Sequence, residues 1–378
     1  MVLYPQFYTH CMKIGLLKED NDQRVALVPD TVSKLTQEGH TVLVEPGAGA
    51  TAYIGDELFT EAGASLKPRA EVLAESELVA TLRPVADADL DAAGEHTAWI
   101  SMYAPFADPA PLKPIADRKQ SALSMDMIPR TTRAQSMDVL SSMANIAGYK
   151  AVLAAAHLMP RYFPMLTTAA GSIPPAKVLV LGAGVAGLQA IATARRLGGV
   201  VEAFDTRSAV KEEVMSLGAK FVEVEGARDD SAAGGYAVEQ TEEYKQRQQA
   251  LIQEKAAKSD VVITTAQLRG RPAPVLLTED TVKNMKPGSV IVDLAASTGG
   301  NCAVTEDGQT VEKHGVIIVG DSDLHVKMPQ HASQLYSKNI HNFLKLLVGE
   351  EAALTFNFED DIVASATVVH EGTVKFGS

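Results

Sequence analysis

A glycine-rich segment in the second half of the chain has the residue types and the spacing of a phosphate-binding turn. Gly182-Ala183-Gly184-Val185-Ala186-Gly187 has the pattern G-x-G-x-x-G; it follows the apolar run 178–181 and precedes a predicted helix over 185–197. In such a unit the first glycine permits the tight turn, the second lets the backbone approach a pyrophosphate, and the third allows close helix packing. The segment therefore predicts a dinucleotide bound at the helix N-terminus. A glycine-rich packing turn is the structural alternative.

An acidic residue stands where such a site holds the ribose of the nucleotide. Asp205 ends the next predicted strand, 200–205, and lies 23 residues after Gly182. A carboxylate there accepts hydrogen bonds from both ribose hydroxyls and repels a 2′-phosphate, which favours NAD over NADP. Arg207 keeps NADP as an alternative, because an arginine nearby can accept a 2′-phosphate. Three neighbouring strand-end residues complete the predicted cofactor set: Thr206, Thr265 and Ala266.

A second polar segment, Arg130-Thr-Thr-Arg133-Ala-Gln135-Ser-Met-Asp138-Val-Leu-Ser141, lies in the first half of the chain. Pro129 disfavours a helical path into Arg130, so we expect a loop that runs into a helix. We expect Arg130 to pair with Asp138, and Asp138 and Ser141 to share a helix face. Gln135 offers a donor and an acceptor, which match a nicotinamide carboxamide. A polar helix cap with a solvated charge pair is the alternative interpretation.

Short apolar runs alternate with segments of helical spacing along the whole chain, which predicts βαβ units and parallel sheets. The sequence thus indicates an α/β protein with two Rossmann-like doubly wound domains and a cleft between them. The expected strands are 13–17, 41–45, 77–82, 98–102 and 121–125 in the first series, and 177–181, 200–205, 220–224, 260–265, 289–294 and 315–319 in the second.

The domain limits follow from these two series. We expect a first α/β domain over 12–135 plus 332–378, because the amphipathic helix predicted at 334–347 looks like a return onto that domain, and a second, NAD-binding domain over 145–325. One long helix or two over 136–159 would join them. Residues 1–11 are expected to be an extension or leader. The polar, Gly-rich stretch 225–243 is predicted to be a lid that carries Tyr236, with a disordered insertion as the alternative.

Composition excludes several classes of protein. The 378 residues carry 34 Lys and Arg against 47 Asp and Glu, a net charge of −13, which disfavours binding to nucleic acid or to an anionic membrane surface. Two cysteines, nine scattered histidines and the lack of a G-x-S-x-G motif indicate no disulfide framework, metal site or hydrolase triad. We expect no transmembrane helix. Polar residues after the last strands, Asp293, Asn301 and Asp321, are expected either to support the site or to be ordinary loop residues.

These segments resemble the NAD(H)-binding domain I, the alpha or alpha-1 subunit, of proton-translocating nicotinamide nucleotide transhydrogenase. The resemblance covers nearly the whole chain from Met12 and is carried by the 182–187 turn and the R-x-x-R-A-Q-S-x-D loop, together with Arg24-Val-Ala-Leu-Val-Pro29, Thr168-Ala-Ala-Gly-Ser-Ile-Pro-Pro-Ala176 and Lys286-Pro-Gly-Ser-Val-Ile-Val-Asp-Leu-Ala295.

The resemblance implies that Arg130, Gln135, Asp138 and Ser141 contact the nicotinamide side of NAD(H), and that Tyr236 belongs to a loop that closes on the nucleotide. It further implies a homodimer that passes hydride, with Re/Si specificity, to NADP+ on a partner domain III, coupled to proton movement through a membrane domain II. The chain would then be a peripheral component of a membrane complex on the cytoplasmic side of the inner membrane, or on the matrix side in mitochondria.

Alanine dehydrogenase is the alternative enzyme, since it shares the fold and the glycine motif. That family uses a lysine and a histidine of its first domain on a small substrate. Here no lysine occurs between Lys67 and Lys113, and Tyr103 stands where the histidine is expected. Both features argue against amino-acid chemistry. A protein that binds NAD without catalysis is the third possibility.

Overall fold

The computed structural model describes residues 11–224, 241–268, 270–349 and 353–377. The chain divides into two compact units, unit 1 (Met1–Met143 with Val326–Ser378) and unit 2 (Ala144–His325). Each is built on a mainly parallel sheet, so the predicted α/β class is confirmed. The predicted extension 1–11 lies, except for Cys11, outside the described residues.

Unit 1 contains a sheet in the order β17-β16-β6-β5-β4-β1-β2-β3. The six strands from β3 to β6 are parallel and have the doubly wound order 3-2-1-4-5-6. Their bounds are β1 Lys13–Leu16, β2 Thr41–Val44, β3 Ser65–Leu66, β4 Leu78–Ala80, β5 Ala98–Ser101 and β6 Ser121–Ser124. The central strands are buried along their length because both faces of a parallel sheet are covered. The helices of this region are α1 Pro29–Gln37, α2 Asp56–Glu61, α3 Arg69–Glu75, α4 Asp87–Ala92 and α5 Leu112–Asp117.

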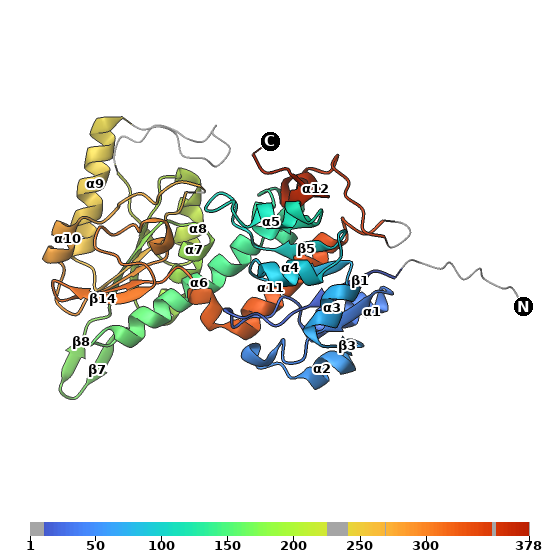
Figure 1. The fold of residues 1–378 in the computed structure, drawn as a ribbon. Helices are drawn as coiled ribbons and strands as arrows, with labels where there is room; N and C mark the ends of the chain where they lie inside the picture. Colours follow the sequence, from blue (N-terminus) through green and yellow to red (C-terminus); the bar gives the residue numbers. More distant parts are fainter. Residues whose placement is uncertain (1–10, 225–240, 269, 350–352, 378) are drawn as a thin grey trace, which may run out of the picture. The chain divides into compact units, whose positions relative to one another are not determined.

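The C-terminal segment returns to unit 1 and completes its sheet. Helix α11 (Pro329–Leu344) begins five residues before the predicted 334, because Pro329 occupies the first turn, where its missing N–H costs nothing. The Tyr336 hydroxyl of α11 donates to the Thr81 carbonyl at 2.9 Å, just after β4. After α12 (Asp361–Ala366), strand β16 (Thr367–His370) pairs antiparallel with β6, and β17 (Thr373–Val374) follows it. Figure 1 shows these orange and red elements among the blue and cyan ones of unit 1.

Unit 2 has a seven-stranded sheet in the order β11-β10-β9-β12-β13-β15-β14. All neighbouring strands are parallel except β14 and β15, which are antiparallel. The chain builds the sheet in one direction from β9 to β11 and in the other from β12 onward, so the strand order reverses between β9 and β12. The strands are β9 Lys177–Leu181, β10 Val200–Phe204, β11 Lys220–Phe221, β12 Val261–Thr264, β13 Val290–Asp293, β14 Gln309–Lys313 and β15 Val316–Gly320. Its helices include α7 Val185–Arg196, α8 Lys211–Ser216, α9 Glu242–Ala257 and α10 Glu279–Asn284.

One helix, α6 (Val139–Leu158), covers the stretch in which the sequence predicts one helix or two, and the boundary between the units falls inside it. Within the described residues it is also the one helix whose length and composition would suit a membrane span. That is weak evidence, since 44% of its apolar window is buried inside the protein, as in a core helix. A two-stranded hairpin, β7 (Leu166–Thr168) and β8 (Gly171–Ile173), follows α6 and projects beyond the larger sheet of unit 2 (Figure 1).

Candidate functional site

The glycine motif forms a tight turn from the end of β9 into α7, at the point where the strand order of unit 2 reverses. Gly182 has φ +101°, which only glycine adopts readily. A Cβ at Gly187 would collide with the carbonyl oxygen of Gly182, whereas a Cβ at Gly184 would meet nothing closer than the Arg207 side chain at 3.9 Å. The turn is therefore closely packed at Gly187 and open at Gly184, where a ligand would approach.

The start of α7 leaves backbone donors available. No side chain caps this end, since Gly184 is the N-cap residue and accepts only the intrahelical bond from Leu188 N–H. Val185 is 41% exposed in the first turn, while Ala183 is buried and Ala186 is partly buried. Uncapped N–H groups and the helix dipole together favour an anion. These residues thus fit the pyrophosphate of a dinucleotide.

Asp205 follows β10 and lies against this turn. Its carboxylate accepts hydrogen bonds from Ala183 N–H at 2.7 Å and from Arg207, through the backbone N–H at 2.9 Å, Nε at 3.0 Å and Nη2 at 2.9 Å. Burial by itself would raise the pKa of Asp205, but the bonds from Arg207 and Ala183 outweigh it and hold the pKa below its ordinary value. Asp205 is therefore an anion at neutral pH, and Thr206 beside it is exposed.

The other edge of the turn is held by the end of β12. The Thr265 hydroxyl donates to the Gly182 carbonyl at 3.1 Å. Asn301, which is fully buried, accepts from Ala266 N–H at 2.9 Å and donates to the Ala266 carbonyl at 2.9 Å and the Pro274 carbonyl at 2.8 Å. The structure thus brings the predicted residues of unit 2 together at one sheet edge, apart from Tyr236, which lies outside the described residues.

Asp293 fixes the backbone that carries Asn301. Its buried carboxylate accepts bonds from Asn301 N–H at 2.7 Å, Thr305 Oγ1 at 2.8 Å and Thr264 Oγ1 at 3.0 Å. Asp293 and Asn301 therefore hold the loop that borders the turn, whereas sequence reasoning places them only after the strands. Sequence reasoning misses Gly148 altogether: a Cβ there would collide with the carbonyl oxygen of Ala186, so α6 packs directly on the turn.

The segment 130–141 lies in unit 1 and differs from the prediction in two respects. Asp138 has an extended backbone (ψ 94°) and precedes α6, so it does not share a helix face with Ser141 as predicted. Arg130 is exposed and forms no ion pair with Asp138 among the described residues, so that predicted pair is wrong. The Asp138 carboxylate instead accepts from the Ser141 backbone N–H at 2.9 Å and its hydroxyl at 2.6 Å. Asp138 thus caps the start of α6, which satisfies N–H groups that helix bonds leave free. The residues before it, Thr132–Met137, form a 3-10 helix.

A different arginine holds this segment in place. Arg133 donates to both Asp360 carboxylate oxygens, at 2.6 and 2.8 Å, and also pairs with Asp361. Arg133 follows Arg130 by three residues and lies in the 3-10 helix, which Arg130 precedes. The partner of Arg133 lies 227 residues further along the chain. Sequence spacing favours a pair with the nearby Asp138, because no residue around Arg133 indicates that its partner, Asp360, lies in the C-terminal segment.

The residue that replaces the expected histidine is not placed for proton transfer. Tyr103 is only 4% exposed, and burial raises the pKa of its phenol further above the ordinary value. Its backbone N–H donates to Ser124 Oγ at 3.1 Å. A phenol in this state remains neutral and does not act as a base near pH 7.

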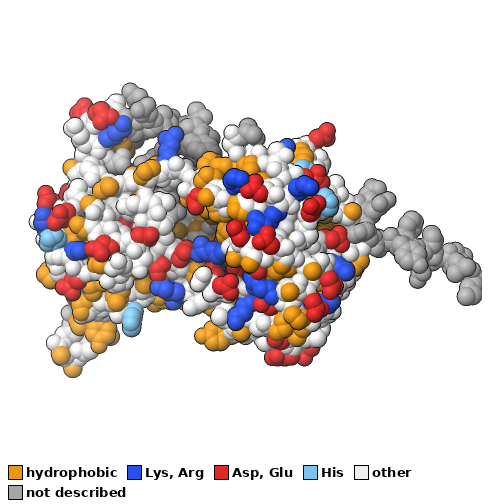
Figure 2. Space-filling model, viewed as in Figure 1, with side chains coloured by type: hydrophobic (Ala, Val, Ile, Leu, Met, Phe, Trp, Pro, Cys, Tyr) orange, Lys and Arg blue, Asp and Glu red, His pale blue; other side chains and the backbone are white. Residues whose placement is uncertain are grey.

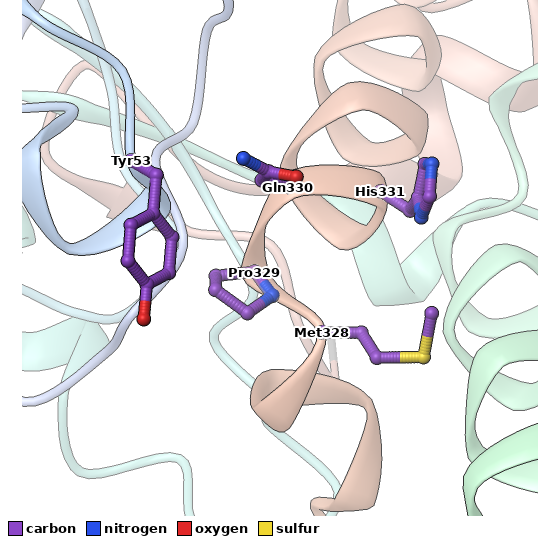
Figure 3. A pocket seen from close by; sticks show the side chains of 5 residues that line it. All are labelled: Tyr53, Met328, Pro329, Gln330 and His331. Atoms are coloured by element: carbon purple, nitrogen blue, oxygen red, sulfur yellow. The ribbon is translucent and has the colours of Figure 1, made fainter.

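Unit 1 also carries a hollow whose lining includes none of the predicted site residues. It has a volume of about 370 Å³ and is lined by Tyr53, Met328, Pro329, Gln330 and His331. Figure 3 shows Tyr53 facing Pro329, while Met328 and His331 point away from it. No group of three His, Cys, Asp or Glu suited to a metal ion occurs among the described residues, in this hollow or elsewhere.

Comparison with known proteins gives the family. Models of the alanine dehydrogenase/PNT N-terminal and C-terminal domains match residues 15–147 and 151–377. The chain is 45% identical over 372 residues to NAD(P) transhydrogenase subunit alpha of Cereibacter sphaeroides, covering 97% of this chain and 71% of that protein. It is 43% identical over 365 residues to NAD(P) transhydrogenase subunit alpha of Haemophilus influenzae, covering 96% and 71%.

A solved structure agrees with these sequence relatives. The crystal structure of transhydrogenase from Sinorhizobium meliloti superposes with a TM-score of 0.88 at 42% identity, covering 96% of this chain and 99% of that one. Alanine dehydrogenase is more distant, at 28% identity for the protein of Mycolicibacterium smegmatis over 96% of this chain and 94% of that protein. The chain therefore belongs to the alanine dehydrogenase/PNT family, among the alpha subunits of NAD(P) transhydrogenase.

Proposed function

We propose that this chain binds NAD(H) at the carboxyl edge of the unit 2 sheet and passes hydride between NADH and NADP+ held by a partner domain. The observation that carries the proposal is the open, uncapped turn at Gly184 beside the ionised Asp205. The nucleotide supplies a hydride at its nicotinamide ring. The chain supplies phosphate contacts at α7 and a carboxylate for the ribose hydroxyls.

Asp205 favours NAD(H) over NADP(H) in this arrangement. Its carboxylate already accepts hydrogen bonds from Arg207, so the guanidinium charge is neutralised by its nearest neighbour. A 2′-phosphate at this place would meet a buried anion and not a free arginine, and like charges at short range are costly. The same carboxylate can accept two hydroxyl bonds once Arg207 shifts away.

The proposed role of segment 130–141 is to orient the nicotinamide. The side chains of Arg130 and Gln135 are exposed and hydrogen-bond to none of the described residues, so both are available to a ligand. Gln135 would bond the carboxamide, and Arg130 would add positive charge close by. Asp138 and Ser141 are engaged with each other at the start of α6, and we assign them to holding the segment.

The reaction needs no acid or base at the reacting carbons. A hydride leaves C4 of NADH and bonds to C4 of NADP+, giving NAD+ and NADPH with atoms and electrons balanced. What the protein must provide is close approach of the two rings and exclusion of water. The buried, neutral Tyr103 and the lack of a lysine between Lys67 and Lys113 agree with this, and they disfavour oxidation of an amino acid.

The proposed partners follow from the subunit relationship. We propose that NADP(H) is bound by a separate domain III, that hydride transfer has Re/Si specificity, and that it is coupled to proton movement through a membrane domain II. This chain would be a peripheral component of that complex, on the cytoplasmic or matrix side. On the face drawn in Figure 2, basic side chains lie among acidic ones, which suits transient contact with a protein better than binding to nucleic acid.

A homodimer is also proposed, and the β7–β8 hairpin supports it. An isolated two-stranded hairpin is marginally stable in water. This one carries exposed apolar side chains: Met165 is 65% exposed and Ile173 38%, and Tyr162 nearby is 53% exposed. A second copy of the chain would cover them.

The experiment that tests the function has two arms. The chain is mixed with NADH, pyruvate and ammonium, and separately with NADH, an NADP+ analogue and the isolated NADP(H)-binding domain of a transhydrogenase. Turnover only in the second arm is expected. Turnover in the first arm would indicate an amino-acid dehydrogenase. Binding of NADH without turnover in either arm would indicate a protein that binds NAD without catalysis.

A further inference from the structure

The backbone around Gln135 is held by the C-terminal segment of unit 1. Met127, Arg133 and Ser136 each hydrogen-bond to a residue that lies more than 200 positions later in the chain. These contacts occur before, within and after the stretch that contains Arg130 and Gln135. The segment is therefore fixed from one side by elements that its own sequence does not contain.

Asn339 of α11 makes the most buried of these contacts. It is 5% exposed, and its Nδ2 donates to the Ser136 carbonyl at 2.8 Å, on the residue directly after Gln135. Asn342, one turn later on α11, donates to the same carbonyl at 3.1 Å. The Asn339 Oδ1 atom is buried without a hydrogen-bond partner in the structure. Burial of an amide with one unsatisfied atom costs free energy, which the two hydrogen bonds to the Ser136 carbonyl help to offset.

The remaining two contacts lie on either side. Arg133 pairs with Asp360, and Asp360 in turn accepts from the Ile362 backbone N–H at 2.9 Å and caps α12. The Ser365 hydroxyl of α12 donates to the Met127 carbonyl at 2.8 Å. Both contacts bind the segment to α12, while Asn339 binds it to α11.

The side chains of Gln135 and Arg130 are left out of this network. Gln135 contributes its backbone carbonyl to the 3-10 helix, and its side chain is exposed. A backbone fixed at both ends with a free side chain between is the arrangement that preorganises a group for a ligand. Of the residues held in this way, Ser136 is the nearest to Gln135 in sequence, and its partner Asn339 is buried.

We infer that Asn339 is a positioning residue for hydride transfer, which sets the direction of the Gln135 side chain by holding the Ser136 carbonyl. The inference rests on the proposed role of Gln135 at the nicotinamide. Asn339 would touch neither the nucleotide nor the reacting atoms, and it would act through the backbone of Ser136. A misplacement of about 1 Å at a reacting centre costs up to about 100-fold in rate.

The test is a double-mutant cycle in the full chain, measured as single-turnover hydride transfer from NADH to an NADP+ analogue on the isolated NADP(H)-binding domain. Asn339→Leu keeps the side-chain shape and removes the donor, and Asn339→Asp replaces the donor with an acceptor. Both should lower the rate by about 10- to 100-fold and leave the NADH dissociation constant within about twofold. Lys338→Ala, on the exposed side of α11, is the matched control and should leave both unchanged.

The decisive comparison is made in a Gln135→Ala background. If Asn339 acts through Gln135, Asn339→Leu should change the rate of Gln135→Ala by less than about twofold, because the group it positions is absent. An undiminished effect in that background, or a normal rate for Asn339→Leu beside a large loss in Gln135→Ala, overturns the inference alone. Absence of transfer by the unaltered chain overturns the proposed function and the inference with it.

Discussion

Gly148→Ala should disturb nucleotide binding although Gly148 lies outside the glycine motif. The added Cβ would lie 2.8 Å from the carbonyl carbon of Ala186 and closer still to its oxygen. Carbon atoms in contact stand about 3.5–4.0 Å apart, so α6 and the start of α7 must separate by roughly 1 Å. The obstacle is backbone on both helices, so no side-chain rotation relieves it.

Two effects of different kind follow from this shift. Overpacking of this sort costs about 1–3 kcal/mol of unfolding free energy. In a unit of this size each kcal/mol lowers the melting temperature by about 2–4 °C, so a drop of roughly 2–12 °C is expected. The first turn of α7 also moves away from the strand that Asp205 follows, and NADH should bind about 10-fold more weakly, since roughly 1.4 kcal/mol is a factor of ten.

Differential scanning calorimetry and NADH fluorescence titration measure the two effects. Lys150→Ala, on the same helix, is the control and should change neither quantity. A variant that melts within about 1 °C of the unaltered protein and binds NADH equally well would refute the packing argument. Weaker binding with unchanged melting would show that the turn moves without resistance, which contradicts the rigid contact.

Four further predictions follow from named contacts. Asp205→Ala should weaken NADH binding by about 1–3 kcal/mol and raise the preference for NADPH, because Arg207 loses its carboxylate partner; calorimetric titration with both nucleotides checks this. Asn301→Ala removes three hydrogen bonds and should lower the unfolding free energy by roughly 3 kcal/mol in urea denaturation, whereas a loss below about 1 kcal/mol would contradict the buried clamp. Burial raises the pKa of Glu19 from 4.5 to about 7, although the hydrogen bond from Leu82 N–H lowers it. The contribution of this carboxyl to stability is therefore fully present below pH 4.5 and is lost as the pH rises through 7, so the unfolding free energy of Glu19→Gln should rise by roughly 3 kcal/mol relative to the unaltered chain between pH 4.5 and about 8. A difference that does not change with pH would refute the assignment. Ile173→Asp should change the mass measured by light scattering from that of a dimer to that of a monomer. An unchanged mass would show that the hairpin is not part of the dimer interface.

The parallel strands are predictable because they are short buried runs bounded by turns. The run 177–181 coincides with β9, and most other predicted strands differ from the observed ones by one or two residues at an end. Strand β16 escapes prediction; it lies between β6 and the edge strand β17, and it follows the short helix α12 directly, with no turn residue to mark where it begins. Its place is fixed by pairing with β6, a partner more than 200 residues earlier.

The site shows the same division between local and distant information. Gly182 and Gly187 can be assigned structural roles because strand, turn and helix are adjacent in sequence. Arg133 and Asn339 cannot, because their partners lie in another segment of the chain. The role of Gly148 cannot be predicted for a further reason. A small residue is common in an alanine-rich helix, and only its close contact with the backbone of Ala186 shows that a larger residue would not fit.

Isotope tracing distinguishes direct hydride transfer between two nicotinamides from exchange through water. NADH carrying deuterium at the 4-pro-R position is incubated with this chain, the isolated NADP(H)-binding domain of a transhydrogenase and NADP+, and the NADPH formed is analysed by mass spectrometry. With direct transfer, the deuterium should appear at C4 of NADPH and not in water, and the Gln135→Ala variant should form this product slowly. Unlabelled NADPH together with deuterium in water, or deuterium retained in NAD+, would contradict direct transfer of the 4-pro-R hydrogen.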